Sequence, residues 1–110
     1  MKIAVISDIH GNIDALEAVM QDLEEQGCET VYALGDYAMA GPEPALTVDW
    51  FFRKQFELNF KMIQGNTDYM IANYNDDLYA TVKEKAPIMA EALKNDSQIL
   101  NSIQKDFLKN

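Results

Sequence analysis

Three short apolar runs, each followed closely by polar residues of the kinds that bind metal ions, constrain the fold of this chain more than any other feature. The runs are residues 3–6, 31–34 and 60–63, and the polar residues that follow them are Asp8, His10, Asp36, Asn66 and Asp68. Continuous apolar runs of this length are typical of strands that are covered on both faces. We therefore predict a fully buried strand over residues 2–7, a second buried strand over 30–34 and a third strand over 58–64.

The segments between these strands have the spacing of amphipathic helices. Apolar residues recur at helical intervals from Ile13 to Leu23, with Asn12 as the N-cap and Gly27 as the stop signal. A second helix, rich in aromatic residues, is predicted over residues 45–56. Strands joined through helices in this way are parallel, with right-handed crossovers.

The rest of the chain is predicted to be helical. A short helix is expected over residues 67–74, a further apolar stripe is interrupted at Pro87, and Asp96 or Ser97 is expected to cap the last helix. The predicted fold class is α/β, a parallel βαβαβ unit followed by two or three helices. At 110 residues we expect one domain over 1–110, with a βα core over 1–68 and a helical segment over 69–110. A three-stranded sheet is narrow, so we expect this sequence to be a truncated chain or a fragment.

The composition argues against several classes of protein. The net charge is −9, whereas binding to nucleic acid or to an anionic membrane needs clustered Lys and Arg. Cys28 is the only cysteine, so no intramolecular disulfide can form, and no apolar stretch is long enough for a signal peptide or a membrane span. We expect a cytoplasmic protein with no nucleic-acid-binding surface and no membrane contact.

The polar residues after the strands predict a metal site. In open parallel sheets, ligands bind beyond the carboxyl ends of the strands, and Asp8, His10, Asp36 and Asn66 all fall there. Carboxylate, imidazole and amide oxygen together suit Mn, Fe, Zn or Ni. Asp36 lies on the middle loop and is the best candidate to bridge two ions. Each motif alone is common in turns and helix caps, so the prediction depends on all three together.

These motifs also resemble those of a known family. Asp8-x-His10-Gly11-Asn12, Gly35-Asp36 and Gly65-Asn66-x-Asp68 are similar to the first three motifs of the calcineurin-like metallophosphoesterases, in the branch of small bacterial phosphoesterases. The resemblance implies that the chain forms the N-terminal half of the family's sandwich.

The resemblance also implies an activity and a set of roles. It implies hydrolysis of a small-molecule phosphomonoester or phosphodiester by a hydroxide that bridges two divalent ions, most commonly Mn. By the same resemblance Asp8 and His10 bind the first ion, Asp36 bridges and Asn66 binds the second. Asn66, Thr67 and Asp68 would form the catalytic group, with Thr67 standing where the family often has His.

One departure from the family leaves an alternative open. The family takes further histidines from its C-terminal half, whereas His10 is the only histidine here. We therefore expect weak metal binding and little or no catalysis by this chain alone. The alternative is a non-catalytic truncated or regulatory α/β module with residual metal binding, and self-association through an uncovered sheet edge is expected in either case.

Two other classes fit the sequence less well. A receiver domain needs paired acids after the first strand and a Lys after a later one. A dinucleotide-binding fold needs Gly-x-Gly-x-x-Gly after the first strand, and that motif is absent.

Overall fold

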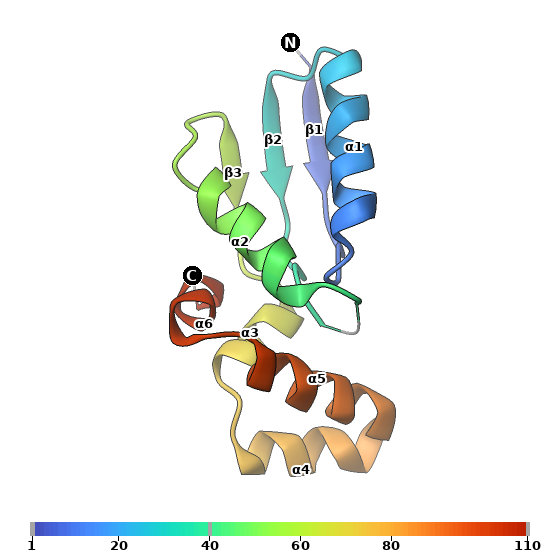
Figure 1. Ribbon diagram of the computed structural model, residues 1–110, viewed down its shortest axis with the longest axis vertical. Helices are drawn as coiled ribbons and strands as arrows, with labels where there is room; N and C mark the ends of the chain where they lie inside the picture. The colour runs from blue at the N-terminus through green and yellow to red at the C-terminus, as the bar shows by residue number, and fades with distance from the viewer. Residues whose placement is uncertain (1, 40, 110) are drawn as a thin grey trace.

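The fold is built on one sheet of three parallel strands in the order β1-β2-β3 (Figure 1). The computed structural model describes residues 2–39 and 41–109. The strands are β1 (Ile3–Ile6), β2 (Thr30–Ala33) and β3 (Phe60–Met62), somewhat shorter than the sequence predicts. Their register aligns Ala4 with Val31 and Val31 with Phe60. The prediction of a parallel α/β fold is confirmed, and all three strands end at the same edge.

Two helices cover one face of this sheet. They are α1 (Ile13–Glu25) and α2 (Pro44–Lys54). Asn12 caps α1 by accepting a hydrogen bond from the Ala15 N–H at 3.0 Å, and Pro44 occupies the first position of α2, where its missing N–H costs nothing. Because the spatial order of the strands follows the chain, right-handed crossovers place both helices on the same side (Figure 1).

The core lies between the sheet and these helices. It contains, from the strands and the helices, Ala4, Ile6, Val31, Ala33, Phe60, Leu16, Val48 and Phe51. Tyr37, from the loop after β2, joins this core with its ring centroid 4.3 Å from that of Phe51. The Tyr37 hydroxyl donates to the Ile63 carbonyl at 2.7 Å, which ties the β2 loop to the end of β3. Burial raises the pKa of Tyr37 far above its ordinary value, so the hydroxyl stays a donor.

The opposite face of the sheet is not covered. Ile3, Val5 and Tyr32 are 54%, 62% and 38% exposed. Successive side chains of a strand point to opposite faces, and both helices of the βαβαβ unit lie on the other side. The prediction that the first two strands are buried on both faces is therefore wrong for the described chain. We call Ile3, Val5 and Tyr32 the uncovered sheet face.

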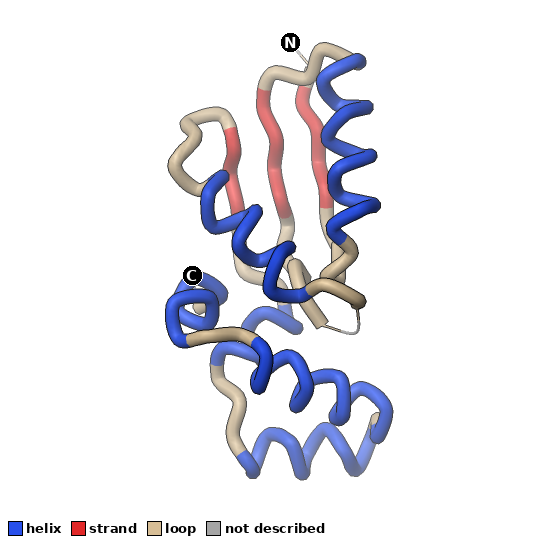
Figure 2. Tube along the Cα trace, viewed as in Figure 1, coloured by secondary structure: helices blue, strands red, loops and turns tan. Residues whose placement is uncertain are grey.

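Four helices follow the sheet and extend beyond its carboxyl edge (Figure 2). They are α3 (Asn66–Ala72), α4 (Asp76–Lys85), α5 (Pro87–Ile99) and α6 (Ser102–Leu108). Pro87 begins α5, which confirms the predicted interruption.

The predicted cap of the last helix is wrong. Asp96 and Ser97 are buried inside α5, and Asn101 caps α6 by accepting from the Gln104 N–H at 2.8 Å. A buried face on α5 overrides the general preference of Asp and Ser for helix starts.

The helices give the molecule an elongated shape, with extents of 46 × 22 × 19 Å. The helical part lies directly below the ends of the strands (Figure 1). Within residues 2–39 and 41–109, none of the helices has the length and apolar character that crossing a bilayer requires. The predicted cytoplasmic location stays a prediction.

Candidate metal centre

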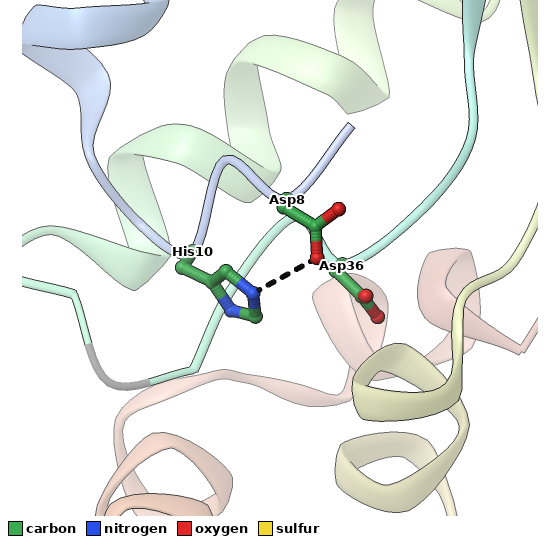
Figure 3. Close-up of side chains that lie close together, drawn as sticks. All are labelled: Asp8, His10 and Asp36. Atoms are coloured by element: carbon green, nitrogen blue, oxygen red, sulfur yellow. Dashed lines mark hydrogen bonds and ion pairs between the residues drawn. The ribbon is translucent and has the colours of Figure 1, made fainter. Parts of the chain in front are cut away.

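The predicted site residues of β1 and β2 are brought together because the two strands stay paired beyond their regular ends. The Asp8 N–H donates to the Gly35 carbonyl at 3.2 Å, and the His10 N–H donates to the Asp36 carbonyl at 3.0 Å. The two loops therefore run side by side. This pairing holds Asp8 and His10 from one loop against Asp36 from the other (Figure 3).

Three ligand-type side chains converge at this edge. One ligand atom from each of Asp8, His10 and Asp36 lies within 4.8 Å of the other two. The Asp8 Oδ1 atom is 3.3 Å from His10 Nε2 (Figure 3). Separations of this size are those expected of groups that share one cation.

The orientation of the His10 ring is fixed by two backbone carbonyls of the loop after β2. Its Nδ1 atom is 3.1 Å from the carbonyl oxygens of both Ala38 and Met39. Two acceptors at Nδ1 require that nitrogen to carry a proton, so Nε2, which faces Asp8, is the ring nitrogen that would bind a cation. No sequence signal identifies these carbonyls, because their contact depends on the path of the loop.

All three converging residues have left-handed backbone. The φ angles of Asp8, His10 and Asp36 are 57°, 51° and 59°. This conformation costs a residue with a Cβ roughly 1–2 kcal/mol, although Asp visits it more readily than most. Strained backbone of this kind gathers at functional sites, and here it coincides with the predicted ligands.

Asp36 is oriented by the first turn of α3. The Thr67 N–H and the Thr67 hydroxyl donate to Asp36 Oδ1 at 3.0 and 2.7 Å. The close approach depends on glycine, because a Cβ added at Gly65 would lie 2.4 Å from Asp36 Oδ1, and one at Gly35 would lie 2.2 Å from the Gly65 nitrogen. The loops after β2 and β3 therefore touch through two residues without side chains.

Asp68 joins the same two loops from inside. Its side chain is fully buried and accepts from the backbone N–H groups of Asp36 at 2.7 Å and of Tyr37 and Gly65 at 2.9 Å. Burial raises the pKa of Asp68, and the three N–H donors oppose that effect. We call this arrangement the Asp68 brace. The predicted catalytic roles of Thr67 and Asp68 stay predictions, and the bonds described here give both residues a positioning role.

Asn66 is placed differently from the converging group. It begins α3 with an exposed side chain that forms no hydrogen bond with the part of the chain that the structure describes. Its predicted roles as a ligand and in catalysis stay predictions.

The donor set fits a divalent cation. Two carboxylates and an imidazole nitrogen supply electron pairs toward one point, and this combination suits Mn, Fe, Zn or Ni.

The Ser7 hydroxyl donates to Asp8 Oδ2 at 2.9 Å and is the first cause of the lowered pKa of Asp8, with Asp36 and His10 contributing. Ser7 was not predicted as a site residue, and its place just before Asp8 is the signal that could have indicated it.

Comparisons with known proteins show which family and which solved structures the chain is similar to. The sequence profile described as "Calcineurin-like phosphoesterase superfamily domain" matches residues 1–107. A hypothetical protein, PH1004, from Pyrococcus horikoshii has a crystal structure similar to this chain, with a TM-score of 0.79 and 25% identity over 98% of the chain. A metallophosphoesterase from Sphaerobacter thermophilus is similar with a TM-score of 0.72 and 26% identity over the whole chain.

A curated relative matches a shorter part of the chain. The uncharacterized protein MJ0912 of Methanocaldococcus jannaschii is 40% identical over 67 residues, or 61% of this chain. The match covers 26% of that protein, and the two structural matches cover 46% and 41% of theirs. The chain therefore spans less than half the length of each of these relatives.

Proposed function

Because this chain belongs to the calcineurin-like phosphoesterase superfamily, we propose that its converging Asp8, His10 and Asp36 form part of a centre for metal-dependent hydrolysis of phosphoesters. The observation that carries the proposal is the grouping of their ligand atoms within 4.8 Å of one another. Family membership supports the proposed reaction class, and this grouping supports the proposed residues.

Each of these residues has a defined part in the proposed centre. His10 offers Nε2 because its Nδ1 faces two carbonyls, and Asp8 offers the oxygen nearest that nitrogen. Asp36 is held by Thr67 and would be shared between two ions. Asn66, exposed at the start of α3, would serve the second ion. Divalent ions bound there would supply positive charge to offset the charge that develops on the phosphoryl group and would activate the attacking water.

The substrate class follows from charge as well as from family. A net charge of −9 does not favour a polyanionic nucleic acid, so we propose a small-molecule phosphoester, either a monoester or a diester. Mn is the proposed metal, since mixed carboxylate and imidazole ligands suit it.

One observation favours a second candidate function. His10 is the only histidine of the chain, so the described residues give two ions few protein ligands and water would complete their coordination. A non-catalytic module that binds metal weakly would have these properties.

Calorimetric titration with Mn²⁺ tests the proposed centre. Asp36→Asn removes one negative charge but keeps an oxygen where Thr67 donates, so the fold should be retained. Asp22→Asn, on the exposed side of α1, is the matched control. We expect Mn²⁺ binding in the wild type and in the control and its loss in Asp36→Asn. Equal binding by all three proteins would contradict the assignment.

Hydrolysis assays separate the two candidate functions. Bis(p-nitrophenyl) phosphate and p-nitrophenyl phosphate are incubated with each protein and Mn²⁺. Turnover that requires both Mn²⁺ and Asp36 supports the phosphoesterase, whereas Mn²⁺ binding without such turnover supports the non-catalytic module.

A further inference from the structure

An apolar pocket lies beside the metal centre, between the end of the sheet and the first turns of α5. Its volume is about 500 Å³, and it is lined by His10, Met39, Thr67, Ala86, Pro87, Ile88, Met89 and Ala92. The helix α5 lies between the strand ends and α4 (Figure 1). The pocket is thus formed by the strand-end loops on one side and by α5 on the other.

The pocket and the metal centre share a wall. His10 lines the pocket and also belongs to the group with Asp8 and Asp36. Thr67 lines it too, and its hydroxyl donates to the Asp36 carboxylate at 2.7 Å. A phosphoryl group held at the metal centre would therefore have the pocket directly beside it.

The lining of the pocket selects for an apolar group. Apart from His10 and Thr67, every lining residue is apolar, and neither Lys nor Arg is among the described residues that form it. A second phosphate would find no cation there, and sugar hydroxyls would lose hydrogen bonds to water without replacement. A pocket of this volume is within the range of small-molecule sites.

We propose that this pocket holds the apolar substituent of the phosphoester, so that the preferred substrates are esters of aryl or long alkyl alcohols. The inference depends on the proposed function, because it assigns the position of the substituent relative to a phosphoryl group at the metal centre. Met39 and Met89 would contact the substituent from opposite sides of the pocket, the first from the loop after β2 and the second from α5.

Binding of phosphonates, which cannot be hydrolysed, tests this inference without measuring activity. The full chain is labelled with ¹³C at its methionine methyl groups and titrated with phenylphosphonate or methylphosphonate in the presence of Mg²⁺, which is diamagnetic. We expect phenylphosphonate to shift the Met39 and Met89 signals and to leave Met20, on α1, unchanged. We also expect it to bind about tenfold more tightly than methylphosphonate, as burial of a phenyl ring predicts.

A matched pair of variants locates the effect. Ile88 lines the pocket and is 88% exposed, so Ile88→Gln should not disturb folding. Ile103→Gln on α6 makes the same change at an exposed site that does not line the pocket. Ile88→Gln should reduce the preference for phenylphosphonate, and Ile103→Gln should leave it unchanged. Equal affinities for the two phosphonates in the wild type, or unshifted Met39 and Met89 signals, would overturn the inference.

The Asp36→Asn variant separates this inference from the proposed function. If both phosphonates bind Asp36→Asn as they bind the wild type, the phosphoryl group does not lie at the metal centre and the proposed function fails. If Asp36→Asn weakens both equally and neither shifts Met39 or Met89, the metal centre is supported and the pocket assignment is overturned.

Discussion

The Asp68 brace gives the sharpest test of how the metal centre is held in place. Asp68 is fully buried and accepts three backbone N–H bonds, from Asp36, Tyr37 and Gly65. Asp68→Ala removes the only side chain that the structure shows accepting from these groups, and leaves one buried donor, on Tyr37, and two half-buried donors, on Asp36 and Gly65, without that partner. An unsatisfied buried N–H costs about 1–3 kcal/mol, so the loss is at least about 1 kcal/mol from the Tyr37 donor and at most roughly 9 kcal/mol if all three donors are penalised in full.

The upper end of that range is comparable with the whole stability of a small domain, about 5–15 kcal/mol. We therefore expect Asp68→Ala to be strongly destabilised. Asp68→Asn keeps one oxygen, which can accept at the Oδ2 position from Asp36 and Gly65, but it places an amide N–H₂ against the Tyr37 N–H. The expected loss is that of one charge-assisted hydrogen bond, about 1.5–3 kcal/mol.

Urea unfolding at pH 7, followed by circular dichroism, measures these differences. The expected order of unfolding free energy is wild type, then Asp68→Asn, then Asp68→Ala. Asp22→Ala, at an exposed position on α1, should lie within about 0.5 kcal/mol of the wild type. A loss below about 1 kcal/mol for Asp68→Ala would refute the reasoning, because the buried Tyr37 donor alone should cost that much.

Three further changes have expected outcomes. Asp8→Gly should have an unfolding free energy roughly 1–2 kcal/mol higher than that of Asp8→Ala, because only glycine adopts the φ of 57° without strain. Equal urea midpoints for the two variants would contradict this. Burial raises the pKa of Asp96 above 3.8, so the folded state binds a proton at Asp96 more tightly than the unfolded state does, and stability falls as the pH rises from about 3.8 through the pKa of the folded state. The difference in unfolding free energy between the wild type and Asp96→Asn should therefore change across that pH window. A constant difference would be evidence against this explanation. Val5→Lys, on the uncovered sheet face, should reduce the concentration-dependent self-association that sedimentation velocity measures. Identical profiles for the wild type and Val5→Lys would show that this face does not mediate self-association.

The sequence predicts the part of the site that depends on sheet geometry. Parallel strands end at one edge, so the sequence alone is enough to group Asp8, His10 and Asp36. The Asp68 brace could not be predicted, because Asp at the third position after a glycine also suits an ordinary helix start. The left-handed backbone of the three candidate ligands was equally hidden, since loop φ angles depend on the pairing of two segments far apart in the chain.

The fold was predicted with similar limits. Apolar runs located the strands and Pro87 located a helix boundary, because both effects are local. Exposure of Ile3 and Val5 was missed because a run of apolar residues does not say which face the helices cover. Asp96 was assigned to a cap because its type favours that position, whereas the structure buries it in α5.

The contact between Gly35 and Gly65 has a consequence for how metal affinity arises. Two backbones that approach so closely, with a Cβ on one falling 2.2 Å from the nitrogen of the other, leave the loops little room to move independently. Asp36, one of the proposed ligands, would therefore be ordered before a cation arrives, and little conformational entropy would be lost there on binding. Affinity is then limited by how many ligands the chain supplies, so added donors, rather than a stiffer loop, would strengthen it.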